Sequence, residues 1–153
     1  MQRRSLYILI VLFAATIIGG CSKQADGPPK LVVDRVECSR CKMLISDTRY
    51  ASALKSEKYL VYDDIGCMLD DMKAKPSLQV QELWFRDFLT DEWISAKQTL
   101  FFLHNSHKTP MGYGYIAAIG DTTKPLPVIA DVSYLGTIEQ LRAEHDKDKA
   151  PKP

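Results

Sequence analysis

The sequence predicts an α+β fold made of two small strand–helix modules, each ββαβ-like. Short strand-like runs cluster on either side of one amphipathic helix, and a second helix ends the folded region. Strands and helices do not alternate regularly, which argues against a doubly wound parallel sheet. Once the two ends are set aside, about 115 residues remain, enough for two small modules that share a core. We expect the modules at 31–80 and 81–145.

The first twenty residues are typical of a lipoprotein signal peptide. Two arginines precede a mostly apolar run from Leu6 to Ile18, which is too short for an ordinary membrane-spanning helix. The run ends in a Gly-Gly-Cys sequence at Cys21. Small residues before a cysteine match the site that lipoprotein signal peptidase cuts. We therefore expect cleavage after residue 20 and lipid on the Cys21 sulfur.

This signal predicts a location on the periplasmic side, anchored by lipid to a membrane, with the outer membrane as one option beside the inner one. Residues 21–30 are polar and proline-rich and predict a flexible tether, and 146–153 predict a disordered tail. Without the two signal arginines, 18 basic residues face 19 acidic ones. This near-neutral balance gives no electrostatic footprint for nucleic acid.

The first module begins with runs rich in β-branched and aromatic residues, which favour strands. A turn that contains two cysteines, at 38–43, follows the first of these runs. The strands are expected at 31–37, 50–55 and 59–62.

A helix is expected next, with Asp63-Asp64 offering its N-cap. Apolar residues recur at helical spacing from Ile65 to Met72 and predict one buried stripe. The helix should end before Pro76, because the residue before a proline avoids the helical conformation.

The second module repeats the pattern of strands followed by a helix. Strands are expected at 81–88, 99–104 and 113–119. Thr137 and Gln140 have the spacing of a capping box and predict the start of the last helix.

The chemistry of the chain is concentrated in Cys38-x-x-Cys41-x-Met43, two thiols and a thioether within six residues. Soft sulfur donors select soft ions, and Cu(I) accepts both thioether and thiolate. If the backbone from Cys41 to Met43 is extended, both side chains lie on one face. The motif therefore favours a soft-metal site, while a structural or redox disulfide and half of a zinc site remain open alternatives.

Three cysteines remain once Cys21 carries lipid, and an odd number leaves one thiol without an intramolecular partner. The third is Cys67, in the first turn of the expected helix, where a helix N-terminus lowers a thiol pKa. It is either a third sulfur ligand or a small residue packed against a strand.

Three further residues lie around a Thr-Pro-Met-Gly-x-Gly segment at 109–114. Met111 within it should be held out of the core, where a thioether is available to a metal. His104 and His107 precede the segment and are either further ligands or surface residues.

Taken in order, these motifs resemble the nitrous oxide reductase accessory lipoproteins of the NosL type. The matching features are the Gly-Gly-Cys signal, the 38–43 motif, Asp-x-x-Thr-x-Glu-Trp-Ile-x-Ala at 87–96, and the 109–114 segment. The resemblance covers most of residues 36–119. One departure is Lys42, where members of the family usually have glycine.

The resemblance implies a metallochaperone that binds a single Cu(I) in the periplasm and delivers it during maturation of nitrous oxide reductase. It implies two modules akin to those of organomercurial lyase, without lyase activity. The family's ligands correspond to Cys41, Met43 and Met111, and Cys38 matches a cysteine that only some members have. The implied partners are a copper enzyme as acceptor and a membrane copper exporter or complex as donor.

Two other readings of the same residues stay open. One is a thiol-dependent enzyme for disulfide exchange or mercury handling that uses Cys41 and Cys67. The other is a structural lipoprotein with a Cys38–Cys41 disulfide.

Overall fold

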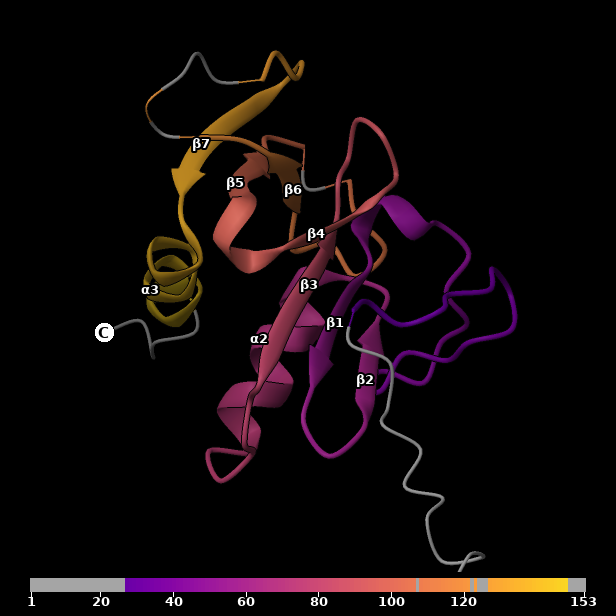
Figure 1. The fold of residues 1–153 in the computed structure, drawn as a ribbon. Coiled ribbons are helices and arrows are strands. Elements are labelled where there is room, and N and C mark those ends of the chain that lie inside the picture. The colour runs from indigo at the N-terminus through magenta and orange to yellow at the C-terminus, as the bar shows by residue number, and fades with distance from the viewer. Residues whose placement is uncertain (1–26, 107, 122, 124–126, 149–153) are drawn as a thin grey trace, which may run out of the picture.

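A computed structural model describes residues 27–106, 108–121, 123 and 127–148 of the chain. These residues form two antiparallel sheets and two α-helices, so the predicted α+β class is confirmed (Figure 1). The signal peptide and Cys21 lie outside the described residues, as does His107. No helix in the described ranges has the length and apolar character needed to cross a bilayer.

The first sheet has four strands in the order β2-β1-β3-β4. Leu54 in the central strand pairs with Leu60 on one side and Leu83 on the other, which places three leucines in one row. Helix α2 packs against β1 and β2 (Figure 1). The elements are β1 (Ser52–Lys55), β2 (Tyr59–Tyr62), α2 (Ile65–Ala74), β3 (Glu82–Arg86) and β4 (Trp93–Ser95), with a 3-10 turn η1 (Thr48–Tyr50) before them.

The second sheet has three strands in the order β6-β5-β7, and α3 packs against β5 and β7. A 3-10 turn joins the two sheets. The elements are η2 (Ala96–Gln98), β5 (Thr99–His104), β6 (Tyr115–Ile119), β7 (Val132–Gly136) and α3 (Ile138–Asp148).

The two sheets share one apolar core. Phe85 of β3 meets Phe101 of β5 edge to face, with 4.8 Å between ring centroids, and both are fully buried. Met68 of α2 and Leu141 of α3 belong to the same buried cluster. Because both helices contribute to this buried cluster, the two sheets pack around it together and do not each enclose a separate core there.

Most predicted elements are confirmed, including both helices and the strands near 52–55, 59–62, 82–86, 99–104 and 115–119. The strand expected at 31–37 is wrong: the chain turns there, with Asp34 at φ +55°, and makes one isolated bridge from Glu37 to Leu44. Strands β4 and β7 had not been expected. Helix α3 runs to Asp148, three residues into the stretch expected to be a tail.

The carboxyl-terminal helix is fastened to α2 by polar contacts. The buried His145 places Nε2 3.0 Å from Asp70 Oδ1, and the other oxygen of Asp70 accepts a 2.5 Å hydrogen bond from the Tyr113 hydroxyl. Lys73 forms an ion pair with Asp146 at 2.8 Å. These contacts hold the last turn of α3 and the chain before β6 against α2.

The start of α2 is closely packed. Asp64 caps it, as predicted, by accepting a 2.9 Å hydrogen bond from the Gly66 amide. Gly66 lies under the Tyr113 ring, and a Cβ built on it would overlap the ring carbons. The glycine is therefore required by close approach rather than by backbone conformation.

We expect Gly66→Ala to destabilise the fold by about 1–2 kcal/mol, because overpacking costs about 1–3 kcal/mol and the gain in helix propensity offsets only about 1. Urea unfolding measures the change. In a Tyr113→Ala background the overlap is gone, so the same substitution should become neutral or stabilising. A cost that persists in that background would contradict the packing explanation.

Candidate metal centre

The first two cysteines lie in a tight turn. The Cys38 amide donates to the Met43 carbonyl at 2.8 Å, and the Lys42 amide donates to the Cys38 carbonyl at 3.1 Å. The Ser39 amide donates to the Val61 carbonyl at 2.7 Å and so ties the turn to β2. Closing the turn requires a left-handed residue at position 42.

Lys42 occupies this left-handed position, with φ +66°. This conformation favours glycine, because a Cβ crowds the neighbouring carbonyl oxygen in the left-handed region. It also means that the backbone from Cys41 to Met43 is not extended, so the condition under which their side chains would share a strand face is not met.

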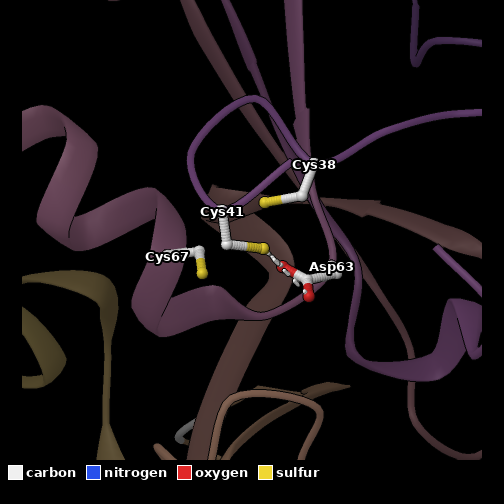
Figure 2. A group of neighbouring side chains, drawn as sticks. All are labelled: Cys38, Cys41, Asp63 and Cys67. Atoms are coloured by element: carbon white, nitrogen blue, oxygen red, sulfur yellow. Dashed lines mark hydrogen bonds between the residues drawn. The ribbon is translucent and has the colours of Figure 1, made fainter. Parts of the chain in front are cut away.

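Two further donors come from the end of β2 and the start of α2. Asp63 follows β2 directly, and Cys67 lies in the first turn of α2. Figure 2 shows the Asp63 carboxylate pointing toward the Cys41 sulfur and Cys67 beside Cys41. One ligand atom from each of Cys38, Cys41, Cys67 and Asp63 lies within 4.8 Å of the others, a grouping that could hold a metal ion.

Burial distinguishes the four donors. Cys38 is 0% exposed, and Cys67 and Asp63 are each 2% exposed. Cys41 is half-buried, and its thiol donates to the Asp63 carboxylate with both oxygens 3.4 Å away. All three thiols are free of disulfide bonds. The cluster therefore has a closed inner side and one donor at the surface.

The three thiols and the carboxylate differ in their pKa values. A hydrogen bond from the Cys67 thiol lowers the pKa of Cys38, and the same contact together with burial raises the pKa of Cys67. Burial raises the pKa of Cys41 to about 11. The metal-free cluster thus ionises most readily at Cys38, and a metal must displace protons from the thiols whose pKa values are raised.

Asp63 is the fourth donor and was not foreseen from the sequence. Desolvation raises its pKa to about 6, and the hydrogen bond with Cys38 contributes in the same direction. Both aspartates of Asp63-Asp64 had been interpreted as helix caps, and only Asp64 has that role. The sequence feature that could have indicated this donor is the pair Asp63-Asp64 at the end of a strand, with Asp63 four residues before Cys67.

The two methionines are exposed, Met43 by 45% and Met111 by 40%. The 109–114 segment is bound to the residue next to Asp63: the second oxygen of Asp64 accepts from Thr109 Oγ1 at 2.6 Å and from the Met111 amide at 3.0 Å. Met111 is thus held out of the core, as expected, on a segment fixed to the start of α2.

The described histidine near that segment takes no part in the four-residue group. His104 ends β5, with Nδ1 2.9 Å from Ser106 Oγ and 3.8 Å from the Asp131 carboxylate. His107 lies outside the described residues.

The raised pKa of Asp63 predicts a pH dependence for the metal-free protein. The folded state keeps a proton that the unfolded chain, with a pKa of 3.8, has already lost. Stability contributed by this proton is present below about pH 4 and is lost as the pH rises through about 6. Asp63→Asn should therefore stabilise the metal-free fold by about 1–2 kcal/mol at pH 7 and have little effect at pH 4. Urea unfolding of both proteins at the two pH values checks this, and an equal effect at both would contradict it.

Comparisons with known proteins leave the site to be interpreted from its own chemistry. No protein-family model, no curated protein and no solved structure matches the chain. The function must therefore be argued from the donor set, its burial and its place on the fold.

Proposed function

We propose that this chain is a lipid-anchored periplasmic carrier of copper(I). The observation that supports this most directly is the convergence of three thiols and one carboxylate within 4.8 Å. The resemblance noted in the sequence suggests nitrous oxide reductase during its maturation as the client that accepts the copper.

Copper(I) fits the sulfur-rich donor set. Thiolates are soft ligands, and thioethers add affinity for Cu(I) that they do not add for harder ions. Two exposed thioethers lie on segments that lead to the cluster: Met43 is two residues beyond Cys41, and Met111 is bound through its amide to Asp64. We include them as ligands of the ion on its way in or out.

The unequal burial of the thiols suggests how the ion is exchanged. Cys38 and Cys67 hold it from the closed side, and Cys41 is the donor that an incoming ligand meets first. Transfer proceeds by replacing protein sulfur with partner sulfur or nitrogen, one ligand at a time. No covalent bond of a substrate is made or broken, so we do not propose a catalytic residue.

The carboxylate makes zinc the main competing ion. Three thiolates and one carboxylate also satisfy a closed tetrahedral Zn(II) site. Asp63 is the only hard donor in the group, so its contribution distinguishes the two metals. Asp63→Asn should weaken Zn(II) binding more than Cu(I) binding.

A thiol-dependent enzyme is the second candidate, because one observation favours it. Cys38 has a lowered pKa and lies beside the thiols of Cys67 and Cys41, whose pKa values are raised. That is a nucleophile with proton donors at hand. Complete burial of Cys38 counts against attack on a large disulfide substrate.

We expect the reduced, oxygen-free protein to bind one equivalent of Cu(I) in competition with a chromogenic chelator. Cys38→Ser and Cys67→Ser should each lower the affinity by about 100-fold or more, because even an outer partner of a ligand is worth about 10–100-fold. Met43→Ala and Met111→Ala should cost less.

The matched control is Met72→Leu. It removes a sulfur from α2, the helix of Cys67, at a residue outside the four-donor group. It should leave the affinity unchanged. Failure to bind Cu(I), or tighter binding of Zn(II) than of Cu(I) in the same assay, would make the copper proposal wrong. Turnover of a disulfide substrate that depends on Cys38 would favour the enzyme instead. Mass spectrometry without reductant would reveal a Cys38–Cys41 bridge.

A further inference from the structure

Among the described residues, four of the ten large apolar side chains that are exposed lie in one short segment near the amino-terminal end. We call residues 31–46 the amino-terminal hairpin, because its two halves run side by side. The Asp34 amide donates to the Ile45 carbonyl at 3.0 Å, and the Ile45 amide donates to the Val36 carbonyl at 2.9 Å. Four large apolar residues of this hairpin are exposed: Val32 by 57%, Val33 by 45%, Met43 by 45% and Leu44 by 51%.

The hairpin has an inner and an outer side. Leu31, Val36 and Ile45 pack inward against a core cluster that includes Val61 of β2. The four exposed residues are therefore not simply core residues left uncovered by a loose segment. They form a second apolar set on a segment whose own core contacts are already made.

Cations accompany this exposed set. Lys30, Arg35 and Lys42 are exposed in or beside the hairpin, and Arg40 is also exposed but lies 3.8 Å from the buried Asp71 carboxylate. The exposed acidic residues of the same stretch are Asp34 and Glu37. Lysine and arginine side chains beside aliphatic ones fit the interface of a bilayer with anionic headgroups. Each cation near such a surface contributes about 1 kcal/mol.

The position of the chain before the hairpin fits the same orientation. The Gly27 carbonyl accepts a hydrogen bond from the Tyr59 hydroxyl, so the chain is fixed to β2 at that point. Cys21 lies six residues earlier. A fully extended chain of that length spans at most about 20–22 Å. Lipid on Cys21 therefore keeps this side of the domain close to the bilayer.

We propose that the amino-terminal hairpin docks on the anionic bilayer to which Cys21 is anchored, with Val32, Val33, Met43 and Leu44 in the interface. This rests on the lipid anchor of the proposed function and adds an orientation to it. Cys41 belongs to the same hairpin, so docking holds this half-buried thiol near the membrane surface. A membrane-embedded metal donor then meets that thiol without diffusion of the carrier.

The test uses the full lipidated chain in vesicles that contain a lipid with a quencher near the acyl carbonyl. Val33→Trp places a fluorophore on the hairpin, and Leu44→Trp repeats the measurement at a second site. The matched control is Val128→Trp, at a residue that is 95% exposed and precedes β7, on the sheet away from the hairpin (Figure 1). The wild-type protein gives the background from Trp84 and Trp93.

In vesicles of phosphatidylcholine and phosphatidylglycerol we expect strong quenching at positions 33 and 44, and none above background at 128. Pure phosphatidylcholine, or Arg35→Glu with Lys42→Glu, should reduce the quenching at least severalfold. Equal quenching at 33 and 128, or none at 33 and 44, would overturn the proposal. So would a chain that carries no lipid by mass spectrometry.

Copper binding is measured separately on the same tryptophan variants in detergent. Unchanged Cu(I) affinity together with absent quenching would overturn the docking and leave the carrier function standing. Loss of Cu(I) binding in the wild-type protein would instead remove the carrier function, whatever the quenching shows.

Discussion

The buried carboxylate of Asp64 is the interaction on which the arrangement of the site depends. It is 0% exposed, and one of its oxygens caps α2 at the Gly66 amide. Its other oxygen accepts from Thr109 Oγ1 and from the Met111 amide. Burial of such a group is costly unless hydrogen bonds satisfy it, and here three do. A single side chain thereby fixes the start of the helix that carries Cys67 and the segment that carries Met111.

Local patterns were sufficient for most of the fold because they reflect local physics. The stripe from Ile65 to Met72 and the apolar run at 99–104 are visible in the local sequence, and both elements were predicted. The error at 31–37 has the opposite cause: β-branched residues favour a strand, but the Asp34 turn folds the segment back so that it pairs with residues around Ile45. Tertiary pairing overrode propensity there.

The site was harder to predict than the fold because it is assembled across the chain. The spacing of Cys38 and Cys41 indicated a metal site, and Cys67 was considered as a third ligand. Asp63 was not recognised as a donor, because a doubled aspartate at a strand end also fits a helix cap and because the end of β2 and the first turn of α2 together bring Asp63 to the thiols. The left-handed conformation of Lys42 was not predicted either, because a lysine does not by itself indicate a φ of +66°.

The fastening of α3 to α2 has a consequence for how the chain matures. All four donors lie between residues 38 and 67, yet the contacts that brace α2, the helix of Cys67, come from Thr109, Tyr113 and His145. A chain interrupted after β2 and α2 would carry every thiol but not the frame that brings them together. The helix that carries Cys67 is thus held in place by the loop before β6 and by α3, parts of the chain that lie far beyond the last donor in the sequence.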